Sequence, residues 1–191
     1  MNPVKPENIG IIILAAGRSL RFGADKRKAM LADGNSLLDS TLAKVPESFQ
    51  KKILALKAED EDLADLYKSR WQICLANNPD AGMANSLSSA IKAASGWEAA
   101  VIGLGDMPYI NQATYGAVQK ALTQHEIVIP GLGGKRGNPV GFRQHFFNEI
   151  LQLEGDQGAK SLLQKYSDQC FVLETQDEGI IRDIDTPDKL T

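Results

Sequence analysis

Cysteine is scarce in these 191 residues, and the two that are present, Cys74 and Cys170, both lie inside apolar runs. This setting favours buried, reduced thiols over a disulfide. Histidine is equally scarce, with two residues, and no cysteine–histidine spacing typical of a zinc site occurs. We therefore expect neither a disulfide framework nor a zinc centre.

Positive charge is not in excess either, because 21 Lys and Arg residues stand against 24 Asp and Glu residues, for a net charge of −3. A general nucleic-acid binder usually carries a basic surplus. No apolar run approaches the length of a membrane span, and the first residues lack the apolar core of a signal peptide. These absences predict a cytoplasmic protein that binds neither nucleic acid nor a membrane.

What the sequence does contain is a series of short, β-branched apolar runs that alternate with helical patterns. Such runs predict strands buried on both faces, and the alternation is typical of a doubly wound sheet. The predicted strands are Ile9–Leu14, Lys52–Leu56, Ile73–Ala76 and Ala99–Leu104. The predicted helices are Leu37–Val45, Asp60–Arg70, Ala84–Ala94 and Gln112–Thr123. We predict an α/β, Rossmann-like, doubly wound fold with a mostly parallel (mixed) sheet flanked by helices.

The pattern changes after about residue 126, where a short strand at Ile127–Pro130 precedes a glycine-rich loop at Gly131–Pro139. The remaining predicted elements are helices at about Gln144–Leu153 and Gly158–Tyr166 and strand-like runs at Cys170–Glu174 and Gly179–Asp185. No linker and no low-complexity tract interrupts the chain. We therefore predict one domain over residues 1–191.

The first predicted strand ends in a small-residue turn that is followed by positive charge. Ala15, Ala16 and Gly17 allow backbone N–H groups to approach an anion closely. The basic residues that follow are Arg18, Arg21, Lys26, Arg27 and Lys28. The stretch has neither the Gly-Lys-Ser/Thr of a Walker A loop nor the Gly-x-Gly-x-x-Gly of a dinucleotide-binding fold. Taken alone, the stretch fits a phosphate-binding turn and a tight turn with a solvated basic face about equally well.

Two acidic segments are candidates for a metal site. Asp106 follows a predicted buried strand, at the sheet edge where open parallel sheets bind ligands, and a carboxylate there suits Mg²⁺. Asp183 and Asp185 alternate near the C-terminus, so that both project from one side of the chain. Taken alone, each segment also fits a plain turn or helix cap. A close approach of Asp185 to Asp106 would favour a cation between them, because neighbouring carboxylates repel one another.

Three further segments contain polar residues that are candidates for ligand contacts. They are Asn78, Gly82 and Ser86 after the third predicted strand, Lys135 and Asn138 in the glycine-rich loop, and Asp156 and Lys160 around the start of a predicted helix. Hydroxyl and free N–H groups near a helix start can bind a nucleoside or a phosphate. For each segment a cap, a hairpin or a turn remains the simpler alternative.

Together these residues resemble the MobA-like nucleotidyltransferase family, and within it the molybdenum cofactor cytidylyltransferases and their guanylyltransferase relatives. The resemblance rests on an ordered set of short motifs spread over nearly the whole chain. They are Leu14-Ala15-Ala16-Gly17, Arg21, Gly23, Lys26, Asn78-Pro79, Gly82-Met83, Ser86-Leu87, Gly105-Asp106-Met107-Pro108, Gly137, Pro139-Val140, Gly155-Asp156, Gly158-Ala159, Leu162-Leu163 and Asp183-Ile184-Asp185-Thr186-Pro187.

The resemblance implies a fold of the nucleotide-diphospho-sugar transferase type, with a nucleotide-binding part at about 1–110 and an acceptor-binding part at about 111–191. It implies a site of four residue groups: Arg21, Lys26 and Asp106 as catalytic residues; Leu14, Ala15, Ala16, Gly17, Arg18, Arg21, Lys26, Asn78, Gly82 and Ser86 at the nucleotide; Lys135, Asn138, Asp156 and Lys160 at the acceptor; and Asp106 and Asp185 at Mg²⁺.

The same resemblance implies the substrates. The Leu-Ala-Ala-Gly form is similar to the cytidylyltransferase branch, which implies CTP rather than the GTP of its relatives, and a phosphorylated small-molecule acceptor such as molybdopterin. A molybdoenzyme or its insertion chaperone is a further candidate partner. Two departures from the family pattern are Asn138, where histidine is common, and Lys28, a second candidate for the role of Lys26. Transfer to a sugar or polyol phosphate, and a cofactor-insertion chaperone without turnover, remain alternatives.

Overall fold

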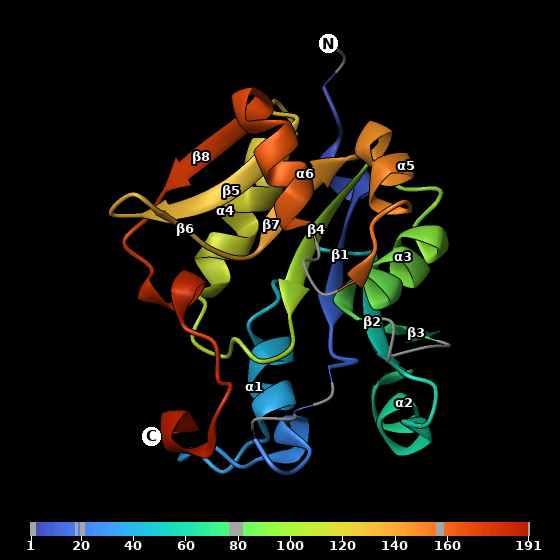
Figure 1. Cartoon of the computed structure of the whole chain (residues 1–191), viewed down its shortest axis with the longest axis vertical. Coiled ribbons are helices and arrows are strands. Elements are labelled where there is room, and N and C mark those ends of the chain that lie inside the picture. The colour runs from blue at the N-terminus through green and yellow to red at the C-terminus, as the bar shows by residue number, and fades with distance from the viewer. Residues whose placement is uncertain (1–2, 18, 20–21, 77–81, 156–158, 191) are drawn as a thin grey trace.

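The computed structural model describes the chain except for residues 1–2, 18, 20–21, 77–81, 156–158 and 191. The strands are β1 (Ile9–Leu14), β2 (Lys52–Lys57), β3 (Gln72–Ala76), β4 (Ala99–Leu104), β5 (Ile127–Leu132), β6 (Lys135–Arg136), β7 (Val140–Arg143) and β8 (Cys170–Glu174). Across these described residues the strands form one eight-stranded sheet in the order β3-β2-β1-β4-β7-β5-β6, with β8 paired to β5 (Figure 1).

The direction of the strands makes the sheet mixed but mostly parallel. The first four strands are parallel to one another. Strand β7 lies antiparallel between β4 and β5, which returns β5 and its neighbour β8 to the direction of the first four. The predicted fold class is therefore confirmed, with β7 and the short β6 as the antiparallel insertions.

Helices follow most strands. The α-helices are α1 (Leu37–Ala43), α2 (Glu61–Tyr67), α3 (Met83–Ala93), α4 (Gln112–Leu122), α5 (Phe147–Ile150) and α6 (Lys160–Lys165). Short 3-10 helices are η1 (Pro6–Asn8), η2 (Lys26–Lys28), η4 (Gln144–Phe146), η6 (Ser167–Gln169), η7 (Glu178–Ile181) and η8 (Pro187–Leu190). Within the described part of the chain, every helix is too short or too polar to cross a membrane.

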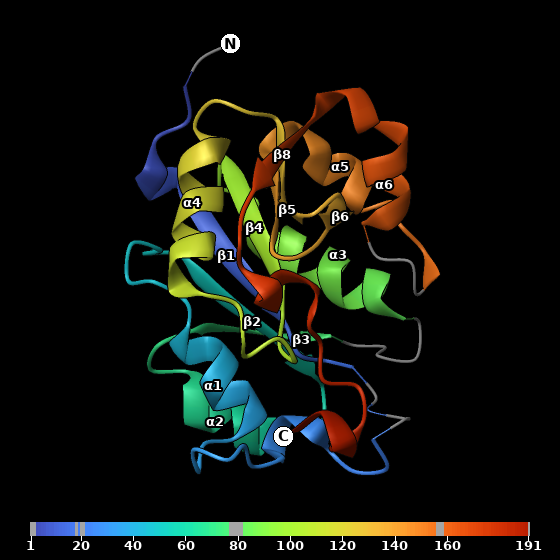
Figure 2. The ribbon, with the colours of Figure 1, turned by 90° about the vertical axis from the view of Figure 1, so that its left-hand side faces the viewer.

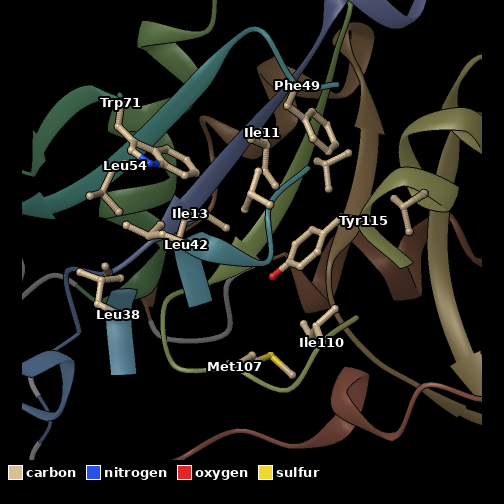
Figure 3. Packing of buried hydrophobic residues seen from close by; sticks show 14 of the residues in the cluster. Ile11, Ile13, Leu38, Leu42, Phe49, Leu54, Trp71, Met107, Ile110 and Tyr115 are labelled. Atoms are coloured by element: carbon tan, nitrogen blue, oxygen red, sulfur yellow. The ribbon is translucent and has the colours of Figure 1, made fainter. Parts of the chain in front are cut away.

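Side-chain alternation in the central strands divides the core into two layers. In β1, Ile11 and Ile13 pack with α1, α2 and α4, whereas Ile12 and Leu14 pack with α3, α5 and α6. Figure 2 shows these two sets of helices on opposite faces of the sheet. Figure 3 shows the first layer, in which Ile11 and Ile13 lie near Leu42 and Tyr115. Because both faces are covered, β1 is buried along its whole length and has a continuous apolar sequence.

Most predicted elements are confirmed, with ends that differ by a few residues. The strands at Ala99–Leu104 and Cys170–Glu174 have the predicted bounds, and the helix predicted at Gln144–Leu153 is shorter, as η4 followed by α5. Two short strands, β6 (Lys135–Arg136) and β7 (Val140–Arg143), were not predicted. β7 is a strand because β4 and β5 pair with it on either side, and β6 is a strand because it pairs with the end of β5.

The strand predicted at Gly179–Asp185 is wrong, because this segment begins in the 3-10 helix η7. The Asp177 carboxylate accepts a hydrogen bond from the Gly179 N–H at 2.9 Å, which closes a local turn. Gly179 also lies so close to the Tyr109 carbonyl oxygen that a Cβ atom would come within 2.2 Å of it. The segment therefore docks on the loop after β4 instead of joining the sheet.

Candidate active site

The candidate active site lies where β1 and β4 end side by side. From β1 the chain builds the sheet outward through β2 and β3, and it then returns to add β4 on the other side of β1. Ligands of open α/β sheets bind at such a switch point, beyond the carboxyl ends of the strands. The Gly105 N–H donates to the Leu14 carbonyl at 2.9 Å, so the turn after β1 and the turn after β4 lie against each other.

Three carboxylates meet at this edge. Asp106, the second residue after β4, and the two alternating residues Asp183 and Asp185 each place one oxygen within 4.8 Å of the others. The Ile184 N–H donates to the Asp106 carbonyl at 3.0 Å, which fixes the C-terminal segment beside the end of β4. Figures 1 and 2 show this segment passing the ends of the central strands on its way to the C-terminus.

The Lys26 side chain lies among these groups. Its ammonium is 2.6 Å from Asp106 Oδ2 and 3.1 Å from Asp185 Oδ1, and it donates to the Ile184 carbonyl at 3.2 Å. The other oxygen of Asp106, Oδ1, is buried and has no hydrogen-bond partner within the described ranges. The site therefore combines a satisfied cation with an unsatisfied carboxylate oxygen.

Burial and charge shift the acid–base properties of this group in two ways. Burial raises the pKa of the Asp106 carboxyl above its usual value, with Lys26 opposing the shift. Burial alone would lower the pKa of Lys26, but the charges and hydrogen bonds of Asp106 and Asp185 outweigh it, so that this pKa is raised. Lys26 therefore stays a cation at neutral pH.

The neighbouring residue, Arg27, holds the turn in place from inside the protein. Its guanidinium donates to both carboxylate oxygens of Asp60, to both of Asp25, and to the Ala15 carbonyl at 2.9 Å. The side chain is only 5% exposed. Such a planar fork matches two carboxylates at once. Arg27 thus ties the end of β1 to η2, the short helix that carries Lys26.

Lys28 points elsewhere. It pairs with Asp62 at the surface, where both side chains are more than half exposed. Successive residues of a 3-10 helix are about 120° apart, so the three basic residues of η2 face three directions. The structure therefore places Lys26, and not Lys28, at the carboxylates.

A second anchor positions the C-terminal segment and the loop predicted to bind the acceptor. The buried Asp177 carboxylate accepts hydrogen bonds from the Asn111 N–H at 2.8 Å and the Thr114 hydroxyl at 2.5 Å, at the start of α4. Three residues on, the Ile180 carbonyl accepts from the Asn138 N–H at 2.9 Å. The loop that contains Asn138 is thereby joined to the segment that carries Asp183 and Asp185.

Most of the other predicted site residues can be placed on elements of the fold. The end of β1 has three buried residues, Leu14, Ala15 and Ala16, followed by the exposed Gly17. Gly82 precedes α3 with a φ of +86°, and Ser86 is buried inside that helix. Lys135 is exposed on β6, and Lys160 is exposed at the start of α6. Arg18, Arg21, Asn78 and Asp156 lie outside the described residues.

An open cavity of about 470 Å³ adjoins the start of α3. Its lining comes from Ala84, Asn85 and Ser88 of α3 and from residues 151–155. This second wall directly precedes Asp156, one of the residues predicted at the acceptor. The cavity offers room for a small molecule beside the segments predicted to bind substrates.

For two residues of the site the sequence did not predict the position that the structure gives them. Asp183 was recognised only as the alternating neighbour of Asp185, and that alternation was the available signal for a third carboxylate. In the sequence, Arg27 is one of five basic residues expected around an anion. No local pattern distinguishes it from Lys26 and Lys28, because its partner Asp60 is 33 residues away.

Comparison with known proteins identifies the family. The MobA-like NTP transferase domain matches residues 11–170. The chain belongs to this family. Purine catabolism protein PucB of Bacillus subtilis (strain 168) is 28% identical, with 96% of this chain and 94% of that protein covered. The family resemblance inferred from the sequence is thereby confirmed.

Solved structures of other proteins have a similar fold. Rv0371c from Mycobacterium tuberculosis H37Rv has a TM-score of 0.81 at 26% identity, covering 95% of this chain and 94% of that one. Its complex with manganese gives 0.77, at 23% identity, covering 95% of both chains. Molybdopterin-guanine dinucleotide biosynthesis protein A from Archaeoglobus fulgidus gives 0.67 at 17% identity, covering 95% of this chain and 94% of that one, a similarity of fold alone. The predicted nucleotide-diphospho-sugar transferase type of fold is confirmed.

Proposed function

We propose that this protein transfers a nucleoside monophosphate from an NTP, with CTP favoured, to a phosphorylated small-molecule acceptor, molybdopterin or its metal-loaded form, and releases pyrophosphate. The observation that supports this most is the meeting of Asp106, Asp183 and Asp185 beside the small-residue turn at the switch point of the sheet. Family membership supports the reaction class, and the Leu-Ala-Ala-Gly motif supports CTP.

The residues of the site fit a divalent metal ion. Hard cations such as Mg²⁺ prefer carboxylate oxygens, and Asp106 Oδ1 is a buried oxygen without a partner in the described parts of the chain. We assign Asp106 and Asp185 as the ligands, with Asp183 next to them. A bound Mg²⁺ would neutralise negative charge on the phosphates. The manganese complex of Rv0371c is consistent with a divalent ion in a related structure.

In the proposed reaction, an oxygen of the acceptor phosphate attacks the α-phosphorus of the NTP. A new P–O bond forms to the acceptor, the bond to the bridging oxygen of the β-phosphate breaks, and pyrophosphate leaves with that oxygen. A phosphate monoester has a second pKa of about 6, so it is largely a dianion at pH 7 and requires no general base. The chain's part is to position the two phosphates and to offset their charge.

Basic residues supply that positive charge. We assign Lys26 and Arg21 to the triphosphate, the latter from its place in the family motif. Backbone N–H groups of the turn at Ala15–Gly17 would receive phosphate oxygens, because small side chains leave the backbone accessible. Lys135, Asn138, Asp156 and Lys160 are assigned to the acceptor. The cavity beside α3 is lined by residues 151–155, which precede Asp156 in the sequence, and this supports an acceptor in the cavity.

The test is pyrophosphate release with each of the four NTPs, against molybdopterin and against a panel of sugar and polyol phosphates. We expect turnover with CTP and molybdopterin, and slower turnover with GTP. Ala16→Gly should raise the use of GTP, because one methyl group at the turn is worth about 1–3 kcal/mol of discrimination. Turnover only with a sugar or polyol phosphate would contradict the acceptor assignment. Tight binding without any pyrophosphate release would indicate a cofactor-insertion chaperone instead.

A further inference from the structure

The cation in the site has a position that the proposed function does not explain. If Lys26 served only the triphosphate, its ammonium would have no reason to contact both proposed metal ligands. Yet it is bound to Asp106 Oδ2 at 2.6 Å and to Asp185 Oδ1 at 3.1 Å, and a backbone carbonyl completes three oxygen contacts. The ammonium thus contacts carboxylate oxygens of the kind that bind a divalent metal ion.

The ammonium and a metal ion would compete for the negative charge of the same two carboxylates. Mg²⁺ binds oxygen at about 2.0–2.1 Å, and it demands near-ideal geometry. An ion held by Asp106 and Asp185, even one that used the unpartnered Asp106 Oδ1, would occupy the same two carboxylates as the Lys26 nitrogen, which contacts both of them. Two positive charges this close together repel in a partly buried site. The repulsion favours the departure of one of them.

Of the charged groups in the site, the Lys26 side chain is the one that can move most easily. Its nitrogen sits on a flexible four-carbon stem, whereas the backbone of η2 is held by the buried Arg27. The three carboxylates, by contrast, come from the end of β4 and from a segment that is fixed to it through the Ile184 N–H. A released ammonium needs a new anionic partner, and the triphosphate assigned to the neighbouring turn would supply one.

We infer that Lys26 is a resident counter-ion of the metal site, which a divalent metal displaces and which then pairs with the bound triphosphate. This inference rests on the proposed function for the identity of the two ligands. It predicts weak metal binding by the nucleotide-free protein, because the metal competes with a cation that belongs to the chain. It also makes metal and nucleotide mutually supportive, since each ligand favours the Lys26 position that the other needs.

The test is the affinity of the nucleotide-free, full-length protein for Mn²⁺, measured by the loss of the free-ion electron paramagnetic resonance signal. Lys26→Met should bind Mn²⁺ about tenfold or more tightly than the wild type, because a charge-assisted competitor has been removed. Lys28→Met is the matched control. It removes the same charge two residues away, from a surface pair with Asp62, and should leave the affinity unchanged.

A second measurement needs no variant. In ¹⁵N-labelled wild-type protein, the Lys26 ammonium resonance should shift on addition of saturating Mg²⁺, while the Lys28 resonance stays in place. Equal or weaker Mn²⁺ binding by Lys26→Met, or a Lys26 resonance that ignores Mg²⁺, would overturn the inference. Absence of Mn²⁺ binding in every variant would overturn it together with the assigned metal site. Tighter binding by Lys26→Met without pyrophosphate release by the wild type would leave it standing and refute only the transferase activity.

Discussion

Lys26 and Arg27 are adjacent in the sequence, and each is bound by carboxylates, but the two groups differ in how completely they are satisfied. The Arg27 guanidinium donates to both oxygens of Asp25 and of Asp60, and Asp60 also accepts from the Lys57 N–H. The Lys26 group leaves Asp106 Oδ1 buried and without a partner in the described residues. The first group is closed, and the second is open on one side.

This difference separates a structural ion pair from a site for a ligand. A buried charge that has all its partners is costly to disturb and has nothing further to bind. A buried carboxylate oxygen without a partner costs free energy until a cation or donor arrives. The same contrast is seen in the pKa shifts, since the pKa of Asp25 is lowered and that of Asp106 is raised. Among the described residues, the Arg27 group has all its hydrogen-bond partners and the Lys26 group does not, so the Lys26 group is the one available to a ligand.

The largest expected effect comes from breaking the closed group. Arg27→Met should lower the free energy of unfolding by about 3–5 kcal/mol, because it leaves the buried Asp60 carboxylate without its cation. Urea denaturation measures this loss, and Lys28→Met, at the exposed end of the same turn, is the control with an unchanged midpoint. A loss below about 1 kcal/mol in Arg27→Met would show that Asp25 and Asp60 do not depend on this residue.

Breaking the open group should affect turnover and not stability. Asp106→Asn keeps the shape of the side chain but removes its charge, so we expect pyrophosphate release to fall by about 100-fold or more at an unchanged melting temperature. Asp62→Asn provides the control, because it removes an exposed carboxylate that pairs only with Lys28 in the described structure. Near-normal turnover of Asp106→Asn in saturating Mg²⁺ would reduce Asp106 to a turn residue.

The smallest expected effect is a difference between the pKa values of the Asp25 and Asp106 carboxyls in the metal-free protein. Burial acts to raise the pKa of Asp25, but Arg27 outweighs it and keeps this pKa below 3.8, whereas burial raises the pKa of Asp106 above 3.8. Carboxyl ¹³C shifts followed against pH measure both values. The reverse order of the two titrations would contradict the contrast between a closed and an open group.

The two shifts also have opposite consequences for stability. Asp25, with a depressed folded pKa, contributes stability above its unfolded pKa and loses it as the pH falls through the folded value. Asp106, with a raised folded pKa, contributes most below its unfolded pKa and loses that contribution as the pH rises through the folded value. In Arg27→Met the pKa of Asp25 should rise, while that of Asp106 should stay raised.

Much of the fold could be predicted because its signals are local. The strand β1 is apolar along its whole length since helices cover both faces of the sheet, and that pattern is written in six consecutive residues. The position of Asp106 could be predicted in the same way, because a Gly-Asp pair follows a buried strand. The strand predicted over Gly179–Asp185 failed because this segment begins as a 3-10 helix with Gly179 against the Tyr109 carbonyl of the loop after β4, instead of pairing in the sheet.

The sequence alone thus determined the central strands, the small-residue turn, the family motifs and the end of β4 that carries Asp106. Only the tertiary structure decided which of three consecutive basic residues serves the site. A 3-10 turn sends Lys26, Arg27 and Lys28 in different directions, and their partners Asp106, Asp60 and Asp62 lie 80, 33 and 34 residues away in the chain. Side-chain charge is a local property, but whether a charge is buried, satisfied or open to a ligand depends on partners that only folding brings together.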